Sequence, residues 1–477
     1  MLFYFITDDN IEKHLSTKSV INRKNEVVCI WKNDKDVSNE LIFEVKHLMD
    51  KDENIHIMSS FVLDKNFYGE YGLNFNQSVL LPKNNLEEIG FSLNNVRIHC
   101  FRSNINFIEL DYVVNSDDPK VINNFNYFMS EVKSNVVLKL SYKKLNENNE
   151  VYVETKELTV LDFILSLIKD FGTLNDMDFK GELSYKSLKP LLVSYLFTEN
   201  STDVNEFESN LGHNYKESYN LNENHLRKTK YFNNSTWYYT VDSISNITYS
   251  TDNALTNTFF SETFTDKVNK LYFPLVLLAA HQKLYCLYVY HKLFEINIDF
   301  TTAEELKNKC DEFTAIKANF DKMSLYYFFD NPSFIEHVNV FYSNVVEAFG
   351  VETYKKAVYS KTNTLIEFSN QCSKLLANYK EKKESKRKII YDIFAIITAS
   401  VFSFASLYDT FLKFLKNINV SFGFTDNILI FSGFAVVCLI IPFIYNLANN
   451  MKKLKKSKAE IAETEKKIKD IGVKIDM

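Results

Sequence analysis

Two long apolar segments near the C-terminus constrain the fold of this chain more than any other feature of its sequence. They cover residues 389–412 and 428–448, which are 24 and 21 residues long. A helix of about 20 apolar residues crosses the roughly 30 Å hydrocarbon core of a bilayer. Only residues 413–427 separate the two segments, so we expect a transmembrane hairpin with a short outer loop. The alternative is a pair of helices buried in the core of a soluble protein.

Basic residues flank this hairpin on its outer sides. Residues 374–388 hold seven Lys or Arg side chains and residues 452–458 hold five, whereas the loop holds only Lys413 and Lys416. Because Lys and Arg accumulate on the cytoplasmic side of membrane proteins, both termini are expected in the cytoplasm and the loop outside. The predicted location is the cell inner (plasma) membrane, as a multi-pass protein in contact with lipid.

Charge and cysteine usage exclude several classes of function. The net charge is −6 although the two membrane-flanking segments are strongly basic, so the rest of the chain is acidic. An acidic body is a poor binder of nucleic acid, whereas basic segments beside a bilayer suit anionic lipid headgroups. The six cysteines are scattered without a CxxC pair, which predicts free thiols in a reducing compartment and neither zinc nor disulfides.

The segment 1–198 has the pattern of a cytoplasmic α/β domain. Short runs rich in β-branched and aromatic residues alternate with Asn, Asp and Lys clusters, which mark strands and turns. Helices are predicted within 118–133, at 159–171 and at 188–197. The strand-like runs are 2–7, 26–31, 40–45, 54–63, 77–82, 96–101, 106–114, 134–142 and 150–155.

The middle of the chain divides into two further segments. Residues 199–256 are rich in Asn, Ser, Thr and Tyr, which predicts a long, loop-rich connector. Residues 257–350 have a helical pattern and form a predicted helical subdomain, with helices at 260–295, 302–328 and 332–349. Within it, residues 271–290 are apolar but interrupted by His281, Gln282 and Lys283, so a buried or interfacial helix is expected there.

Residues 351–388 are predicted to form a stalk helix. Apolar residues recur there at alternating steps of three and four, which is the spacing of a heptad seam. No Pro or Gly separates this segment from the first span, so one continuous helix over about 351–412 is expected. The alternative is an ordinary helix of an antiparallel bundle. The seam residues are Val351, Tyr354, Val358, Leu365, Phe368, Cys372, Leu375 and Tyr379.

The basic tail, residues 449–477, is also predicted to be helical. Leucine or isoleucine recurs every seven residues, which suggests a helix that packs on the stalk. The recurring residues are Leu447, Leu454, Ile461, Ile468 and Ile475.

The sequence contains none of the familiar motifs of catalysis. It has no GxxxxGK[ST], GxGxxG, HExxH or GxSxG pattern, and its nine histidines are spread singly. We therefore expect no enzymatic activity, no catalytic residues and no metal site built from His or Cys.

The first apolar segment carries two acidic residues on one helical face. A carboxylate inside a span is costly and usually faces protein or water. In a homo-oligomer each acid would form a ring that favours cations, and an aromatic side chain between the rings could gate by dewetting. The alternative is that both acids lie at the depth of the lipid headgroups. The predicted pore-lining residues, called here the Asp392–Asp409 face, are Asp392, Ala395, Ala399, Phe402, Ser406 and Asp409.

This layout resembles the CorA superfamily of two-span cation channels and transporters. The resemblance covers roughly residues 260–458 and implies a homopentamer whose first spans line a pore for Mg²⁺ or a related cation. The Gly-Met-Asn signature that binds the hydrated ion in that family is missing, which puts Mg²⁺ selectivity in doubt. The outer loop has instead Gly423, Phe424, Thr425, Asp426 and Asn427, and Gly423 is the only possible remnant of the signature.

Some CorA-like proteins without this signature are membrane effectors of type III CRISPR antiviral defence. They respond to an adenosine-based second messenger, a conjugate of S-adenosylmethionine and AMP. The resemblance therefore implies a nucleotide-gated cation channel that acts as a defence effector. Two alternatives stay open: a CorA-type Mg²⁺ transporter and a membrane-tethered scaffold that conducts no ions. The activating ligand and its binding residues are not predicted by the sequence.

Overall fold

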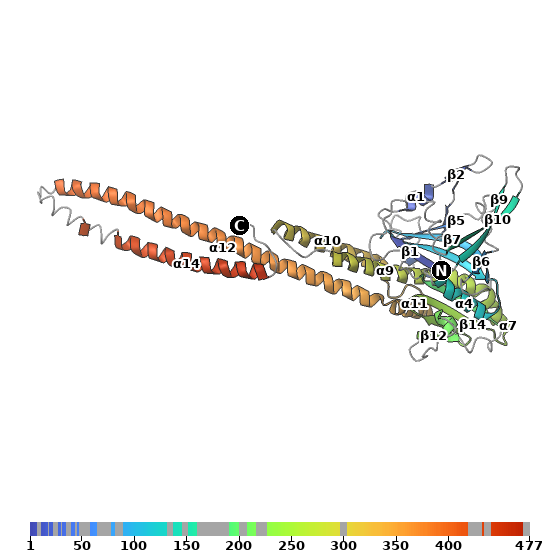
Figure 1. Ribbon diagram of the computed structural model, residues 1–477. Helices are drawn as coiled ribbons and strands as arrows, with labels where there is room; N and C mark the ends of the chain where they lie inside the picture. Colours follow the sequence, from blue (N-terminus) through green and yellow to red (C-terminus); the bar gives the residue numbers. More distant parts are fainter. Residues whose placement is uncertain are drawn as a thin grey trace. The chain divides into compact units, whose positions relative to one another are not determined.

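In the computed structural model the chain folds into helices and sheets that form two compact units. The first unit comprises Met1–His291 and Phe320–Val358, and the second comprises Lys292–Asn319 and Tyr359–Met477. The expected mixture of helix and sheet is confirmed (Figure 1). The structure describes residues 1–6, 11–17, 19–21, 27–29, 31–34, 40–42, 45–46, 58–63, 78–81, 89–130, 137–145, 151–159, 190–199, 208–215, 227–295, 303–417, 432–433 and 440–470.

An eight-stranded antiparallel sheet dominates the first unit. Its longest strand, β7, pairs along one edge with β6 near its start and with β5 near its end. Its other edge pairs with β8. The order is β1-β8-β7-β6-β9-β10, with β5 and then β4 attached to β7. The strands are β1 (Leu2–Ile6), β4 (Trp31–Asp34), β5 (Met58–Leu63), β6 (Ser78–Leu81), β7 (Ile89–Phe101), β8 (Ile105–Val114), β9 (Val137–Leu145) and β10 (Val151–Thr159).

Most of the predicted strands are present, with one clear error. The run 40–45 is not a strand in its described residues, because Leu41 makes only an isolated bridge to Ser333 and Val45 is helical. The run 26–31 divides between β4 and a separate short hairpin of β2 (Ser19–Ile21) and β3 (Val27–Cys29). The helix predicted at 159–171 lies outside the described residues except for Thr159, which is the last residue of strand β10.

Helices cover both faces of the large sheet. Helix α4 (Pro119–Ser130) lies within the predicted helical range and contributes Phe125 and Met129 to the core that Ile98 and Leu110 help to form. On the other face the ring of Phe101 stacks on His281 of α9 with centroids 4.0 Å apart. Since alternate residues of a strand point to opposite faces, β7 and β8 turn apolar side chains such as Ile98 and Leu110 toward α4 and a mixed polar and aromatic set, which includes His99 and Phe101, toward α9.

A second sheet of four strands corrects two predictions. Residues Leu192–Thr198 form strand β11, so the helix predicted at 188–197 is wrong. The segment 199–256 is not a loop-rich connector in its described part, because it supplies helix α6 and the other three strands. The order is β11-β14-β13-β12, with β11 parallel to β14. These elements are α6 (Glu208–His213), β12 (Arg227–Phe232), β13 (Ser235–Tyr239) and β14 (Ser243–Tyr249).

Buried hydrogen bonds explain why this polar segment forms a sheet. Ser235, Asn246 and Thr248 are buried and bond to one another at 2.7–3.2 Å. In the sequence these polar residues resemble a turn signal. In the sheet their side chains form hydrogen bonds with one another, so their burial leaves no hydrogen bond lost. Trp237 and Tyr238 add buried aromatic surface to the same sheet.

The helices predicted at 260–295, 302–328 and 332–349 are present in the described residues, although Lys292–Asn319 belongs to the second unit and the remainder to the first. Helix α9 is buried along much of its length, as expected for the apolar run 271–290. Two of the polar interruptions make hydrogen bonds inside the fold: His281 Nε2 lies 2.6 Å from the Ser103 hydroxyl, although its Nδ1 is buried without a partner among the described residues, and Gln282 donates to Tyr327 and Tyr342. The helices are α7 (Ala254–Thr258), η5 (Phe259–Thr263), α8 (Phe264–Lys267), η6 (Val268–Tyr272), α9 (Phe273–Glu295), α10 (Ala303–Tyr327) and α11 (Glu336–Ala348).

Helix α12 (Val351–Asn417) is a single helix of 67 residues, about 100 Å long at 1.5 Å per residue. It begins in the first unit and continues through the second. It is long and apolar enough to cross a membrane, and no part of its most apolar window is buried in this chain. The predicted continuous helix is therefore present, and it ends five residues after the predicted limit of the first span. The outer loop 413–427 and the second span 428–448 lie mostly outside the described residues.

The tail helix α14 (Ile441–Asp470) packs against α12 in the second unit, where Figure 1 shows the two helices side by side. Cys372 and Tyr379 of α12 form a cluster with Ile461 and Ile468 of α14, and Phe368 packs against it. The predicted packing of the tail on the stalk is confirmed. Part of the stalk seam thus has its partner within the same chain, as in the antiparallel-bundle alternative.

Candidate functional site

All six residues of the Asp392–Asp409 face are exposed in this chain. Phe402, for example, is 71% exposed. Another side of α12, which includes Ile393, Ile396 and Ser400, is partly covered instead. The predicted pore face is therefore separate from the side of the helix that packs within the chain. The outer-loop residues Gly423 to Asn427 lie outside the described part of the chain.

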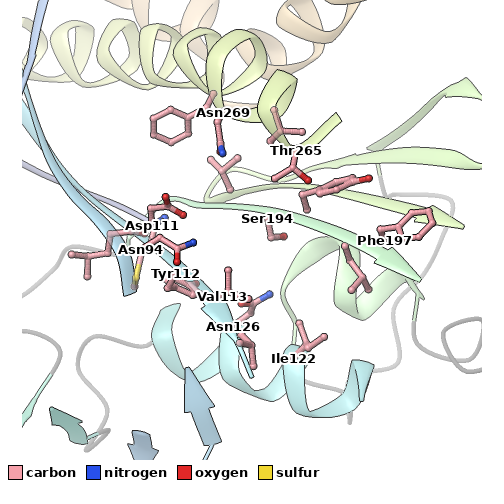
Figure 2. A pocket seen from close by; sticks show the side chains of 18 of the residues that line it. Asn94, Asp111, Tyr112, Val113, Ile122, Asn126, Ser194, Phe197, Thr265 and Asn269 are labelled. Carbon is pink, nitrogen blue, oxygen red and sulfur yellow. Dashed lines mark hydrogen bonds between the residues drawn. The ribbon is translucent and has the colours of Figure 1, made fainter. Parts of the chain in front are cut away.

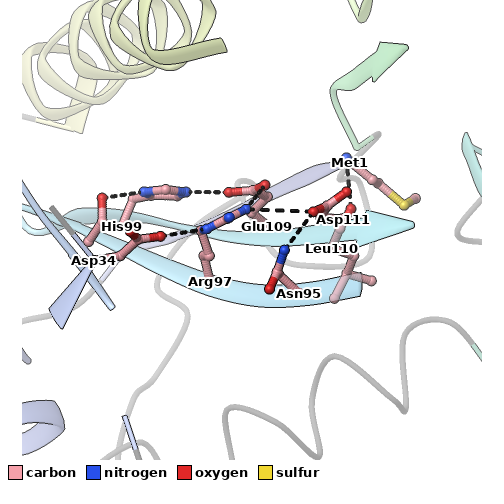
Figure 3. A network of polar contacts seen from close by, with 9 residues as sticks. Met1, Asp34, Asn95, Arg97, His99, Glu109, Leu110 and Asp111 are labelled. Carbon is pink, nitrogen blue, oxygen red and sulfur yellow. Dashed lines mark hydrogen bonds and ion pairs between the residues drawn. The ribbon is translucent and has the colours of Figure 1, made fainter. Parts of the chain in front are cut away.

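The first unit holds a chain of polar contacts across β4, β7 and β8, called here the Glu109 network (Figure 3). Arg97 donates to Asp34 and to Glu109 at 2.7 Å each, and His99 Nε2 lies 2.9 Å from the second oxygen of Glu109. Asp111 accepts a hydrogen bond of 2.8 Å from the side chain of Asn95. Because Arg97 pairs with Glu109 in the strand register, the ion pair follows directly from the sheet.

Burial and pairing act in opposite directions on Glu109. Burial would raise the pKa of its carboxyl, but the hydrogen bond with His99 and the charge of Arg97 outweigh it, so the pKa is lowered. Both oxygens of Glu109 are engaged by these partners. The carboxylate is thus held charged inside the first unit, where an unpaired charge would be costly.

Ser60, His99 and Glu109 stand in the order of a serine, histidine and acid relay. The Ser60 hydroxyl lies 2.7 Å from His99 Nδ1, on the side of the ring away from Glu109. A nucleophile also needs space for a substrate beside it. Neither of the two cavities described below is lined by Ser60 or His99. The contacts of Ser60, His99 and Glu109 join β5, β7 and β8, which fits a structural role in the sheet.

A cavity of about 430 Å³ lies between β8 and β11 and is called here the β8–β11 pocket (Figure 2). Strand β1 pairs with β8 only as far as Glu109, and Leu2 also bridges to Leu191 just before β11. Beyond this point no described strand lies between the two edges, which leaves an open space. Residues of α4, α8, η6 and α9 close its sides. Its volume is in the range of small-molecule sites.

Two polar side chains of this pocket lack hydrogen-bond partners among the described residues. Asn126 of α4 is 4% exposed, and its side chain makes no hydrogen bond with any described residue. The hydroxyl oxygen of Tyr112 on β8 is likewise buried without a partner. Buried polar groups are normally satisfied, and exceptions are often sites where a ligand or water completes the bonding.

The lining of the β8–β11 pocket is acidic. Its described residues include the carboxylates Glu109, Asp111 and Asp117 and no Lys or Arg side chain. The amine of Met1 also lies in the lining, where it donates to the carbonyl oxygen of Leu110 at 3.1 Å. Burial lowers the pKa of that amine, and the nearby Glu109 and Asp111 oppose the effect.

A second cavity of about 310 Å³ has a mainly apolar lining. It contains Lys283 of α9, whose ammonium donates to the Val241 carbonyl at 3.2 Å and lies 5.4 Å from the ring centroid of Phe349. Burial lowers the pKa of Lys283, while the charge of Asp242 opposes this. Phe349 follows α11 and directly precedes Gly350, so the wall of this cavity ends two residues before the long helix begins.

No group of three or more His, Cys, Asp or Glu side chains suited to a metal ion is found among the described residues. Comparison of the chain with protein-family models, with curated proteins and with solved structures finds no match. The candidate sites therefore depend on geometry alone. Sequence reasoning missed the β8–β11 pocket, and the acids within the apolar run 106–114 were its only local signal.

Proposed function

We propose that this chain is a membrane-anchored subunit of a homo-oligomeric, ligand-gated cation channel. The observation that carries the proposal is helix α12. One unbroken helix begins in the first unit, which contains the ligand-sized cavities, and reaches an apolar segment with an exposed acidic face. Such a helix can transmit a change at its N-terminal end to the part that would lie in a membrane.

The proposed topology is a hairpin formed by α12 and the second apolar segment, with both termini cytoplasmic. The antiparallel contacts of α14 with α12 support it, because a returning helix brings the tail back to the side from which α12 starts. The basic flanks support the same orientation. Exposed apolar side chains on both helices, including Phe394, Val401, Ile444 and Tyr445, suit contact with lipid.

The proposed pore is built from several copies of the Asp392–Asp409 face, most simply five by the CorA resemblance. Rings of Asp392 and Asp409 would concentrate cations at the two ends of the span. Phe402 would form the apolar constriction between them. Exposure of this face in the single chain supports the proposal, because a pore lining must be free of contacts within its own subunit.

The proposed ligand site is the β8–β11 pocket, whose volume and unpartnered polar groups suit a small molecule. By resemblance, the first candidate is the adenosine-based messenger of type III CRISPR defence. Its phosphate would find no Lys or Arg among the described lining residues, so the lining of this pocket favours an uncharged or cationic ligand over this messenger. The scaffold alternative is supported by the α12–α14 pairing, since part of the seam is satisfied without other copies.

Conduction is tested in liposome patches by reversal potential and basal current. We expect Asp409→Asn and Asp392→Asn to reduce the preference for cations over anions, and Phe402→Ala to leak without ligand. Ser406→Ala lies on the proposed pore face, and Ser400→Ala on the partly covered side is its matched control. Identical selectivity and leak in all variants and wild type would remove the pore assignment and favour the scaffold.

A further inference from the structure

The β8–β11 pocket contains polar groups whose hydrogen bonding is incomplete. Asn126 presents both a donor and an acceptor, and the Tyr112 hydroxyl adds a further donor. Figure 2 shows these side chains on the same side of the pocket as Ile122, with Asp111 and Asn94 beside them. A molecule in the pocket would therefore meet hydrogen-bonding groups without protein partners, and one of them, the Tyr112 hydroxyl, is already buried and needs no further desolvation.

Asp111 supplies the charge that such a molecule would meet. Its Oδ2 accepts from Asn95 at 2.8 Å and lies 3.9 Å from Arg97, and the charge of its carboxylate also acts on the Met1 amine. Glu109 has both oxygens engaged, so Asp111 is the better partner for a ligand. The Met1 amine is the one cationic group of the described lining, and Arg97, which pairs with Glu109 and lies 3.9 Å from Asp111, is outside that lining.

The rest of the lining includes aromatic side chains that can contact the apolar part of a ligand. Tyr195 and Phe197 of β11 and Phe273 of α9 border the same cavity. Aromatic rings beside a carboxylate form an environment that suits an ammonium group on an apolar skeleton, because the rings contact the carbon atoms and also attract the cation. An anion such as a phosphate monoester would meet acidic groups without a cationic side chain.

We propose that the β8–β11 pocket binds a small organic amine, with its ammonium group on Asp111 and a polar group of the ligand on Asn126. The ligand class follows from the Asp111 carboxylate and the unpartnered Asn126 amide within one cavity of about 430 Å³. The inference rests on the proposed function only for the claim that such a ligand gates a pore. Binding is measured without a current, so failure of binding and failure of conduction are distinguishable.

The test is isothermal titration calorimetry on the full-length protein in detergent. The probes are tyramine, agmatine and spermidine, with 4-hydroxyphenylacetamide and 4-hydroxyphenylacetate as the neutral and anionic counterparts of tyramine, and AMP as the phosphate probe. At least one of the three amines should bind. If tyramine binds, 4-hydroxyphenylacetamide and 4-hydroxyphenylacetate should each bind at least about tenfold more weakly than tyramine. If no amine binds more tightly than the acid and AMP, the proposal is overturned.

Variants then locate the site of the amine that binds. Asp111→Asn and Asn126→Leu should each weaken that amine by roughly tenfold or more, since a hydrogen bond to a charged or buried group is lost. Asp252→Asn, which changes an exposed acid outside the pocket, is the matched control and should bind as wild type does. Unchanged affinity in both pocket variants would place the amine elsewhere and overturn the assignment. The wild-type comparison of probes stays decisive if a variant does not fold.

Discussion

The Tyr379 hydroxyl of α12 donates a hydrogen bond of 3.1 Å to Oε1 of Glu465 on α14, 86 positions further along the chain. Three residues later on α12, Lys382 donates to Thr464, one residue earlier on α14, also at 3.1 Å. The contacts therefore advance along one helix and retreat along the other, so the two helices are antiparallel. The covered positions Leu454, Ile461 and Ile468 of α14 keep the seven-residue spacing of a heptad seam.

Ile468→Ala should weaken the pairing of α12 with α14. Ile468 is fully buried, and shortening a buried Ile to Ala costs roughly 2–5 kcal/mol through lost burial and a cavity. The readout is the rate of thiol labelling at Cys372, which is 1% exposed, in a variant that keeps Cys372 as its single cysteine. Labelling should be faster in Ile468→Ala and unchanged in Lys466→Ala, an exposed control on the same helix. Equal rates in all three proteins would mean that this pairing does not protect Cys372.

Gly350→Ala should destabilise the turn that joins α11 to α12. Gly350 has a φ of +68°, where an L-residue costs about 1–2 kcal/mol. Its amide donates to the Glu347 carbonyl, and its own carbonyl accepts from Tyr354 as α12 begins. Gly90→Ala is the control, because an added Cβ there meets only ordinary contacts with Asn115. Urea unfolding should show a lower free energy of unfolding for Gly350→Ala only. A decrease of similar size in both variants would contradict the backbone explanation.

Glu109→Gln should lower stability at neutral pH by roughly 1.5–3 kcal/mol, since charged hydrogen bonds to Arg97 and His99 are weakened. The folded pKa of Glu109 lies below its ordinary value of 4.5. Its contribution is therefore present above that value and is lost as the pH falls through the lowered folded pKa. Denaturant midpoints measured between about pH 7 and pH 3 should fall more steeply for wild type than for Glu109→Gln. Asp117→Asn, which changes an exposed acid, should show the same pH dependence of the denaturant midpoint as wild type. The same pH dependence in wild type and both variants would rule out a role for Glu109.

Single cysteines at Asn419 and Asn450, in a background without other cysteines, test the proposed topology. An impermeant thiol reagent applied to intact cells should label the cysteine at 419 and not the one at 450, because the basic flanks predict a cytoplasmic tail. After cell lysis both positions should react, which shows that each thiol is competent. Labelling at 450 alone in intact cells would reverse the orientation and remove the pore model with it.

Local sequence patterns determined most of the helices of this protein. Between Val351 and Asn417 there is no Pro or Gly, and the apolar spacing stays helical, so a continuous helix follows from backbone propensity alone. The same reasoning predicted α4, the buried helix α9 and the packing of the tail on the stalk. It also identified most strands of the large sheet, because β-branched and aromatic runs between turn residues are local signals.

Tertiary structure alone decided the second sheet and the pocket. Ser235, Asn246 and Thr248 have the composition of a loop, and they form strands because their side chains bond to one another when buried. The β8–β11 pocket joins Asp111 of β8, Asn126 of α4 and residues of β11 that lie more than 60 positions further along the chain. No local pattern reports which distant strand edges will face each other, because that depends on how the whole core packs.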